Sequence, residues 1–383
     1  MIKKKLLLIG NGDIKNHYKR FELDQLRKYF NLFSFDCSYL IYKKKITKIN
    51  SKNLLQKNKI KIAQEKIKNK KEFLSKFIHL KPDYVIDGIQ SEFTNALKSK
   101  VKFNFKFVVF NDSIVNWNIN YFKIINLYFL KSFFNHLKIK IFQILKFKNL
   151  NYIYDIGFFA GEDCKKLLSY KNTKDVFWIG SQDYYKNYEK KKIKNKNNLI
   201  TYIDSNIYLN PEIKYLDNKS QNLNFKNLQN HFQKIFEIIE SQTNLKVVVA
   251  LHPNPKLLRN FDNYSLFKRK IYKNKTIELI KKSKLVISDL STAVNFAVLN
   301  YKPIVFAYNN RIKSHKLYEN LVANSNFLGS SVINSDENLK NFTINYSVNY
   351  KKYNNFKNLF INNTNTHKEF KTSEFIKKYL DLC

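Results

Sequence analysis

Cysteine is sparse in this sequence, and the few cysteines are not arranged as pairs. Cys37, Cys164 and Cys383 form no CxxC motif and have no histidine partner at the spacing of a metal site. This pattern argues against a disulfide framework and against a zinc site. It favours a reduced, cytoplasmic protein.

Glycine, proline and arginine are also scarce, with only 7 Gly and 5 Pro in 383 residues. The 69 basic residues are nearly all lysine, and against 30 acidic residues they give a net charge of +39. Sequence-specific nucleic-acid binding relies on the planar fork of arginine, so we expect no nucleic-acid partner. The surplus of lysine is typical of A/T-rich codons, and it also suits an anionic membrane surface or a phosphorylated substrate.

Long apolar runs are absent as well. Residues 118–149 are rich in Phe, Leu and Ile, but lysine interrupts them before they approach the ~20 apolar residues that span a bilayer. A helix there would either pack its apolar face on a sheet or lie in a membrane interface. The basic start of the chain resembles a signal peptide, but its apolar run is too short. We expect a cytoplasmic protein, with peripheral attachment to the inner face of the plasma membrane left open.

Short apolar runs separated by helical patterns predict an α/β protein with parallel sheets. A hydrophobic fraction of 44% is ample for globular cores, and 383 residues favour two domains. The expected strands are 5–9, 84–88, 106–110, 175–179, 199–203, 245–250, 284–288 and 303–307.

A polar, lysine-dense stretch at residues 186–198 suggests an exposed linker between two lobes. We therefore predict an N-terminal lobe over 1–190, which includes the 118–149 segment, and a C-terminal lobe over 199–345. Residues 346–383 are expected to form a tail that ends in a helix. Parallel sheets of this kind bind ligands where their strands end.

The predicted strand at residues 245–250 delivers His252 just past its carboxyl end. Pro253 then fixes the direction of the turn, because its ring restricts the backbone. An imidazole placed there can donate a hydrogen bond to a phosphate, and Lys256 adds a positive charge. A His-Pro pair in isolation is also compatible with an ordinary structural turn.

A second element follows the strand predicted at 284–288. Asp289 precedes an apolar helical pattern that we expect to begin around Ser291, with Ser291 and Thr292 in its first turn. Free backbone amides and hydroxyls at a helix start suit a phosphate group. The same residues also serve as plain helix caps. Placed on what should be neighbouring strands, His252 and this helix start would face one space.

The order of these motifs, with a Lys-Pro strand near residue 303 after them, resembles the donor-binding lobe of GT-B glycosyltransferases. The strand that leads to Asp204 belongs to the same resemblance. Similar enzymes build bacterial surface carbohydrates and include capsule, lipopolysaccharide, sialyl- or Kdo-type and polyol-phosphate transferases. The resemblance implies two Rossmann-like lobes with an interlobe cleft. It also implies that His252, Pro253, Lys256, Asp289, Ser291 and Thr292 bind the nucleotide donor.

The catalytic base is expected from the N-terminal lobe, because an acceptor hydroxyl must lose a proton as it attacks. Asp87 ends a predicted strand before a glycine and is our first candidate; Asp13 and Asp112 occupy similar positions. The Gly10 and Gly12 pair lacks the third glycine of a dinucleotide fingerprint, so we interpret it as a tight turn beside the cleft. We interpret residues 155–163 as a Gly-containing turn with clustered acids.

The function expected is therefore inverting, metal-independent transfer of a sugar or sugar acid from a nucleotide-activated donor to a surface-glycan or lipid-linked acceptor. The nucleotide sugar is a substrate, and we expect no cofactor and no essential metal. A polyol-phosphate transferase, a nucleotide-sugar epimerase and a non-catalytic glycan-assembly protein remain alternatives.

Overall fold

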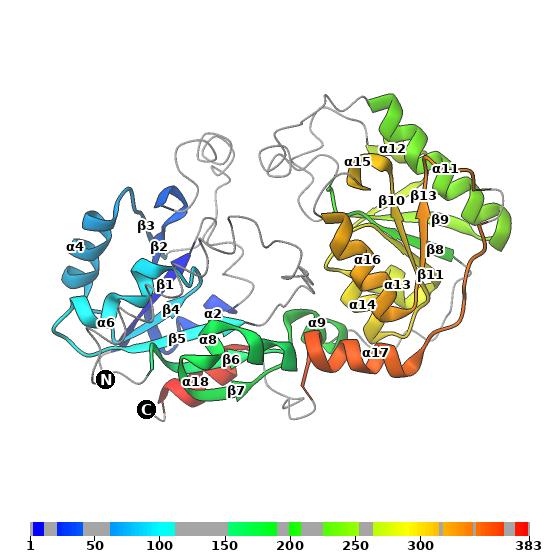
Figure 1. Cartoon of the computed structure of the whole chain (residues 1–383). Coiled ribbons are helices and arrows are strands. Elements are labelled where there is room, and N and C mark those ends of the chain that lie inside the picture. The colour runs from blue at the N-terminus through cyan, green and yellow to red at the C-terminus, as the bar shows by residue number, and fades with distance from the viewer. Residues whose placement is uncertain are drawn as a thin grey trace, which may run out of the picture. The chain divides into compact units, whose positions relative to one another are not determined.

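The computed structural model describes residues 3–10, 21–40, 62–111, 152–189, 199–207, 225–252, 263–313, 317–339, 342–363 and 372–381. The chain divides into two compact units (Figure 1). Unit 1 comprises Met1–Ile114, Ile124–Gln182 and Asn362–Cys383, and unit 2 comprises Val115–Lys123 and Asp183–Ile361. The predicted aromatic and basic helix at 118–149 lies outside the described residues.

Unit 1 is built on a seven-stranded sheet in the order β3-β2-β1-β4-β5-β6-β7, with every neighbouring pair parallel. Its strands are β1 (Lys4–Gly10), β2 (Phe30–Asp36), β3 (Ala63–Lys66), β4 (Tyr84–Asp87), β5 (Lys106–Asn111), β6 (Tyr154–Phe159) and β7 (Thr173–Trp178). Its helices are α2 (Leu23–Leu26), α4 (Lys70–Leu80), α5 (Glu92–Asn95), α6 (Leu97–Lys100), the 3-10 turn η1 (Glu162–Lys166), α8 (Leu168–Lys171) and α18 (Thr372–Asp381).

Both faces of this sheet are covered, which explains why its strands are apolar throughout rather than alternating. In β1, Leu6 and Leu8 point into one core cluster, whereas Leu7 and Ile9 point into the other. The first cluster is closed by α2 and α18, and the second by α4. The unbroken apolar run that opens the chain is therefore a buried strand.

Helix α18 is the last described element of the chain, yet it completes the core of unit 1. Ile376 and Leu380 are fully buried among residues of the sheet and α2. The Tyr84 hydroxyl donates to the Leu380 carbonyl oxygen at 2.7 Å. Figure 1 shows α18, in red, beside β6 and β7. The final helix that the sequence predicts is confirmed.

The Gly-containing turn that we expected over residues 155–163 is right only at its end. Residues 154–159 belong to strand β6, and the turn follows at Gly161, whose φ is 76°, and at the first residues of η1, Glu162 and Asp163. Gly157, inside the strand, is required for packing instead. A Cβ at Gly157 would lie 2.3 Å from the Phe159 ring and 2.8 Å from Thr173 Cγ2. Asp155 is held by the Lys98 ammonium, at 2.7 Å, and by the Phe107 amide.

Unit 2 is built on a six-stranded sheet in the order β10-β9-β8-β11-β12-β13, again parallel throughout. Its strands are β8 (Leu199–Ile203), β9 (Lys246–Leu251), β10 (Lys270–Lys273), β11 (Ser283–Ser288), β12 (Ile304–Tyr308) and β13 (Ser331–Asn334). Its helices are α9 (Gln182–Glu189), α11 (Phe225–Thr243), α12 (Asn263–Phe267), α13 (Thr276–Lys282), α14 (Val294–Leu299), α15 (Asn310–Lys313), α16 (Leu317–Leu328), α17 (Tyr350–Phe356) and the π-helical turn η3 (Lys357–Ile361).

All eight predicted strands are present, at β1, β4, β5, β7, β8, β9, β11 and β12. The expected linker at 186–198 is partly wrong, since its first residues, up to Glu189, continue helix α9; residues 190–198 are outside the described part. The chain passes from unit 1 to unit 2 at the start of α9 and returns after Ile361. Nowhere in the described residues is a helix long and apolar enough to cross a bilayer.

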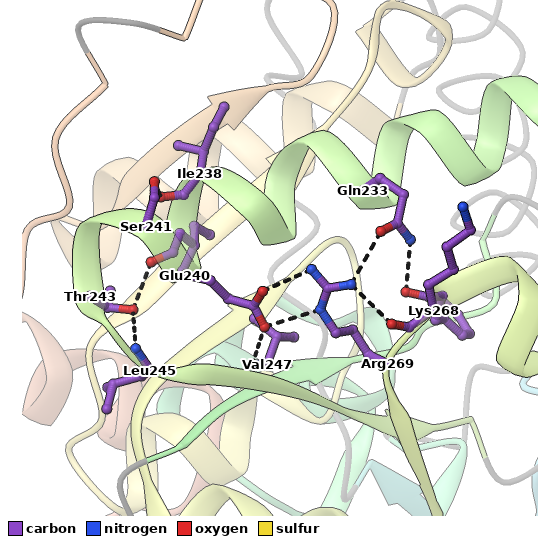
Figure 2. A network of polar contacts seen from close by, with 11 residues as sticks. Gln233, Ile238, Glu240, Ser241, Thr243, Leu245, Val247, Lys268 and Arg269 are labelled. Carbon is purple, nitrogen blue, oxygen red and sulfur yellow. Dashed lines mark hydrogen bonds and ion pairs between the residues drawn. The ribbon is translucent and has the colours of Figure 1, made fainter.

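Arg269, one of the chain's few arginines, joins three elements of unit 2 (Figure 2). Its guanidinium binds both carboxylate oxygens of Glu240 on α11, at 3.0 and 2.8 Å, and donates to Gln233 Oε1 at 3.2 Å. Glu240 also accepts the backbone amide of Val247 at the start of β9. The two side chains are only 18% and 13% exposed. A lysine could not replace this planar, two-pronged contact.

Removing the charge of Arg269 is expected to destabilise unit 2, because Glu240 would be left mostly buried without its partner. We expect Arg269→Met to lower the free energy of unfolding by about 2–4 kcal/mol in urea denaturation followed by circular dichroism. Lys282→Met, which breaks the more exposed Lys282–Glu278 pair on α13, should cost less than about 0.5 kcal/mol. Equal losses in the two variants would contradict the role given to Arg269.

Candidate functional site

A hollow of about 500 Å³ lies at the edge of the unit 2 sheet where the strands end. Its walls are the start of α9, the ends of β8 and β9, residues 274–278, residues 290–293 and Phe296. Strand order reverses between β8 and β11, since the chain runs outward from β8 to β10 on one side and from β11 to β13 on the other. Open α/β sheets bind their ligands at this topological switch point.

The strands that carry His252 and Ser291 are not neighbours, contrary to our expectation. β8 lies between β9 and β11. Asp204, the first residue after β8, therefore occupies the middle of the site. It lines the hollow, although it is only 5% exposed.

Asp204 holds two backbone segments at the edge of the sheet. Its Oδ2 accepts the backbone amide of His252 at 3.0 Å, and its Oδ1 accepts that of Asn206 at 2.8 Å. Burial raises the pKa of the carboxyl, and these two hydrogen bonds oppose the rise. The bond to His252 fixes the backbone at the point where β9 ends.

His252 is half-buried and lines the hollow, as its position after β9 predicts. The hydrogen bond to Asp204 comes from the backbone amide of His252 and does not involve the imidazole. Pro253 and Lys256, the other predicted donor-binding residues of this turn, lie outside the described residues.

Ser291 and Thr292 also line the hollow, but the helix after them begins later than predicted. Helix α14 starts at Val294, and the Ser291 hydroxyl accepts the amide of Ala293 at 3.3 Å. The carbonyls of Ser291 and Thr292 accept the amides of Val294 and Asn295 in a tight turn. These amides are therefore not available to a ligand in this conformation. Thr292 is exposed, and its hydroxyl has no partner among the described residues.

Asp289, which we predicted to bind the donor, is only 2% exposed and is not among the residues that line the hollow. Its carboxylate accepts hydrogen bonds from the Tyr202 hydroxyl, at 3.1 Å, and from the Leu290 amide, at 2.6 Å. Burial raises the pKa of this carboxyl to about 7, and the charge of Asp204 adds to the rise against hydrogen bonds from Ser205, Tyr202 and Leu290. Asp289 thus supports the end of β11, and its described contacts are all internal.

Sequence reasoning missed the residues that α9 and the β10–α13 turn contribute. Asp183 and Lys186 line the hollow from α9, and the Asn295 amide donates to Asp183 Oδ2 at 3.0 Å. Lys275 and Thr276 line it from the turn. We had interpreted Lys186 as part of a linker, and only its position one helical turn after Asp183 could have marked it.

In unit 1, Asp87 has no exposed surface at all. Its Oδ1 accepts the amides of Ile89 and Gln90, both at 2.9 Å, and its Oδ2 accepts the Tyr154 hydroxyl at 3.1 Å. Burial raises its pKa against these hydrogen bonds. In this geometry Asp87 organises the turn after β4.

The other predicted residues of unit 1 give less information. Gly10 ends β1, and its carbonyl accepts the Cys37 amide at 2.8 Å. Gly12, Asp13 and Asp112 are outside the described residues.

The two-unit architecture of this chain is similar to that of a solved enzyme structure. The structure of the wall teichoic acid polymerase TagF is similar over 99% of this chain and 89% of the TagF chain, with 10% sequence identity and a TM-score of 0.51. The fold is GT-B-like. The prediction of two α/β units with parallel sheets is therefore confirmed.

Two further solved structures are similar at TM-scores below 0.5. They are the UDP-GlcNAc 2-epimerase of Methanocaldococcus jannaschii (14% identity, all of both chains, TM-score 0.46) and Acinetobacter baumannii MurG (9%, 99% and 100%, 0.48). No protein family matches the chain. A stretch of 192 residues is 30% identical to a Plasmodium falciparum RNA polymerase subunit beta'', but it covers 45% of the chain and 19% of that subunit.

The raised pKa of Asp289 makes a prediction for stability against pH. Its folded pKa of about 7 exceeds the ordinary value of 3.8, so the folded state holds the proton more tightly. Stability from this group is then full below pH 4 and falls as pH rises toward 7. Asp289→Asn does not titrate, so its free energy of unfolding minus that of the wild type should rise by up to about 4 kcal/mol between pH 4 and 7.

Urea unfolding at each pH measures this difference. Asp175→Asn, which removes an exposed carboxyl on β7, is the control and should shift the curve by a constant amount. A flat difference for Asp289→Asn over the same range would contradict the raised pKa.

Proposed function

We propose that the chain is a glycosyltransferase that moves a sugar or sugar acid from a nucleotide-activated donor. The observation that carries the proposal is the hollow at the switch point of unit 2. Its lining brings His252, Lys186, Lys275 and Thr292 together with three acids, Asp183, Asp204 and Glu278. The protein itself engages the acids: Asp183 accepts the Asn295 side-chain amide, Asp204 accepts two backbone amides, and Glu278 accepts the Lys282 ammonium. Cationic and hydrogen-bond-donating groups at such an edge suit a phosphate.

Unit 2 is then the donor-binding lobe and unit 1 the acceptor-side lobe. In the reaction, the acceptor hydroxyl oxygen bonds to the anomeric carbon while the bond from that carbon to the donor phosphate breaks. The departing nucleoside phosphate keeps the electron pair, and the acceptor proton passes to a carboxylate. His252, Lys186 and Lys275 stabilise the charge that develops on the leaving phosphate. No step of this scheme calls for a metal.

The carboxylate that takes the proton is a separate part of the proposal. Asp87 has no exposed surface and three hydrogen-bond donors, so we favour Asp13 or Asp112. The acceptor is a surface glycan or a lipid-linked glycan of a capsule or lipopolysaccharide pathway. The site of action is the cytoplasm, at the inner face of the plasma membrane.

A polyol-phosphate transferase is the second candidate, and the shared fold of wall teichoic acid polymerase TagF favours it. In that reaction the acceptor attacks phosphorus instead of carbon. Attack at phosphorus of a CDP-activated polyol releases CMP and carries a phosphate into the product, whereas attack at the anomeric carbon leaves the phosphate on the departing nucleotide. Because a CMP-activated sugar acid also releases CMP, the phosphorus content of the product separates the two transfer reactions. Dependence of nucleotide release on an acceptor separates both of them from an epimerase.

Removing the Thr292 hydroxyl should weaken nucleotide binding. One hydrogen bond to a charged phosphate contributes about 1.5–3 kcal/mol, so Thr292→Val should raise the Kd of the preferred nucleotide at least about tenfold. Calorimetry with CMP, CDP and UDP measures this. Thr343→Val, an exposed threonine of unit 2 away from the hollow, should bind as the wild type does. Equal binding by both variants would remove Thr292 from the site.

His252→Ala removes the imidazole but keeps the backbone amide that Asp204 binds. The edge of the sheet should therefore stay intact while stabilisation of the leaving phosphate is lost. We expect kcat for nucleotide release to fall by about 10²-fold or more, with the thermal midpoint within about 2 °C of the wild type. Unchanged turnover by a folded His252→Ala protein would sink the proposed chemistry.

A further inference from the structure

A second hollow, of about 540 Å³, lies in unit 1, at the edge of the sheet where its strands begin. β1, β4, β5 and β6 are consecutive in the sheet and parallel, so their first residues share one edge. Lys4, Tyr84 and Lys106, which begin β1, β4 and β5, line the hollow together with the loop before β5. Gly10 and Asp87 lie at the other ends of these strands, so this hollow is separate from the predicted site residues of unit 1.

Four lysines surround the space: Lys4, Lys98, Lys102 and Lys106. Two of them have internal partners. Lys98 is only 16% exposed and binds Asp155 Oδ1 at 2.7 Å, and Lys4 donates to the Tyr84 hydroxyl at 3.0 Å. The ammonium groups of Lys102 and Lys106 make no hydrogen bond or ion pair with any other described residue.

The two carboxylates of the hollow are committed to the protein itself. Asp83 Oδ2 accepts the Lys5 amide at 2.7 Å, and Asp155 Oδ2 accepts the Phe107 amide at 2.7 Å. Four ammonium groups against two carboxylates leave a surplus of two positive charges. The surplus falls on Lys102, in the loop before β5, and Lys106, the first residue of β5, with three residues between them.

We propose that this hollow binds the phosphate group of a phosphorylated ligand. A phosphate carries up to two negative charges, and a lysine ammonium binds it as a point charge. These two negative charges match the surplus of two positive charges. The amide of exposed Asn104 lies between the two lysines in the sequence and adds a donor. Half-buried Phe103 gives an apolar wall for the part of the ligand that bears the phosphate. The volume is within the roughly 300–1,000 Å³ of small-ligand sites.

The phosphate can belong to a soluble phosphate ester or to a lipid headgroup, and two probes distinguish these sources. Inorganic pyrophosphate, titrated by calorimetry, stands for the soluble ligand. Vesicles of phosphatidylglycerol in phosphatidylcholine, assayed by flotation against pure phosphatidylcholine, stand for the lipid. Both use the full chain.

Lys102→Gln/Lys106→Gln should weaken binding of at least one probe tenfold or more, since two charge-assisted contacts are lost. Lys70→Gln/Lys71→Gln is the matched control, because it removes two exposed lysines of unit 1 at the start of α4, which follows the end of β3 and not the edge where strands begin. Neither pair alters the unit 2 hollow, so any phosphate bound there stays the same in both. Loss with pyrophosphate indicates a soluble ligand, and loss with vesicles alone indicates a lipid.

A single position tests the charge within the hollow more finely. Asn104→Asp should weaken binding and Asn104→Lys should strengthen it, while both leave an exposed side chain of unit 1. The proposal is overturned if the Lys102/Lys106 pair and its control bind both probes equally well, or lose binding equally. It is likewise overturned if Asp and Lys at position 104 act in the same direction.

Discussion

Every described strand in each sheet runs in one direction, and the rest of the structure depends on this constraint. Parallel strands must be covered on both faces, so they are apolar and their side chains are committed to the two cores. Polar chemistry is left to the two edges where strands begin or end. In unit 2 the ending edge collects His252, Asp204 and Thr292 around one hollow. In unit 1 the beginning edge collects lysines around another.

The central strand of unit 2 decides how this edge is organised. β8 precedes the other five strands of the unit 2 sheet in the sequence, and it lies between β9 and β11. Asp204 therefore reaches the backbone of His252 on one side, while its charge acts on Asp289 on the other. Two buried carboxyls at adjacent strand ends disfavour each other's ionisation. The proposed phosphate site consequently rests on a pair of acids that are easier to protonate than ordinary carboxyls.

The fold was largely predictable because burial leaves a plain mark on the sequence. Strands such as β1 and β9 are apolar runs, and all eight that we predicted are present. Of the five strands that we missed, β2, β3, β6, β10 and β13, three carry a weaker mark. β3 and β10 are short, polar edge strands, which proteins use to avoid unwanted pairing. β6 was hidden by Gly157, whose missing side chain serves packing and not a turn.

The site was predictable only in part, since strand order is not written in local patterns. His252, Ser291 and Thr292 do line one hollow, but the strand between them, and with it the central place of Asp204, emerges only from the topology. The contribution of α9 was missed because Lys186 is an exposed residue of a lysine-rich stretch, and nothing in that pattern sets it apart as lining a hollow. Asp87 looked like a free acid because three partners of its carboxylate come from a turn and from a distant tyrosine.

Helix α18 has a consequence for the order in which the protein is made. Its Ile376 and Leu380 fill the core of unit 1, although the chain has by then passed through all of unit 2. During synthesis the first strands of unit 1 must wait, with one core face open, until almost 200 further residues beyond Gln182 have left the ribosome. Unit 2 is continuous from Asp183 to Ile361 apart from a short early segment and can close sooner. The half of the molecule that begins first is thus the half that is finished last.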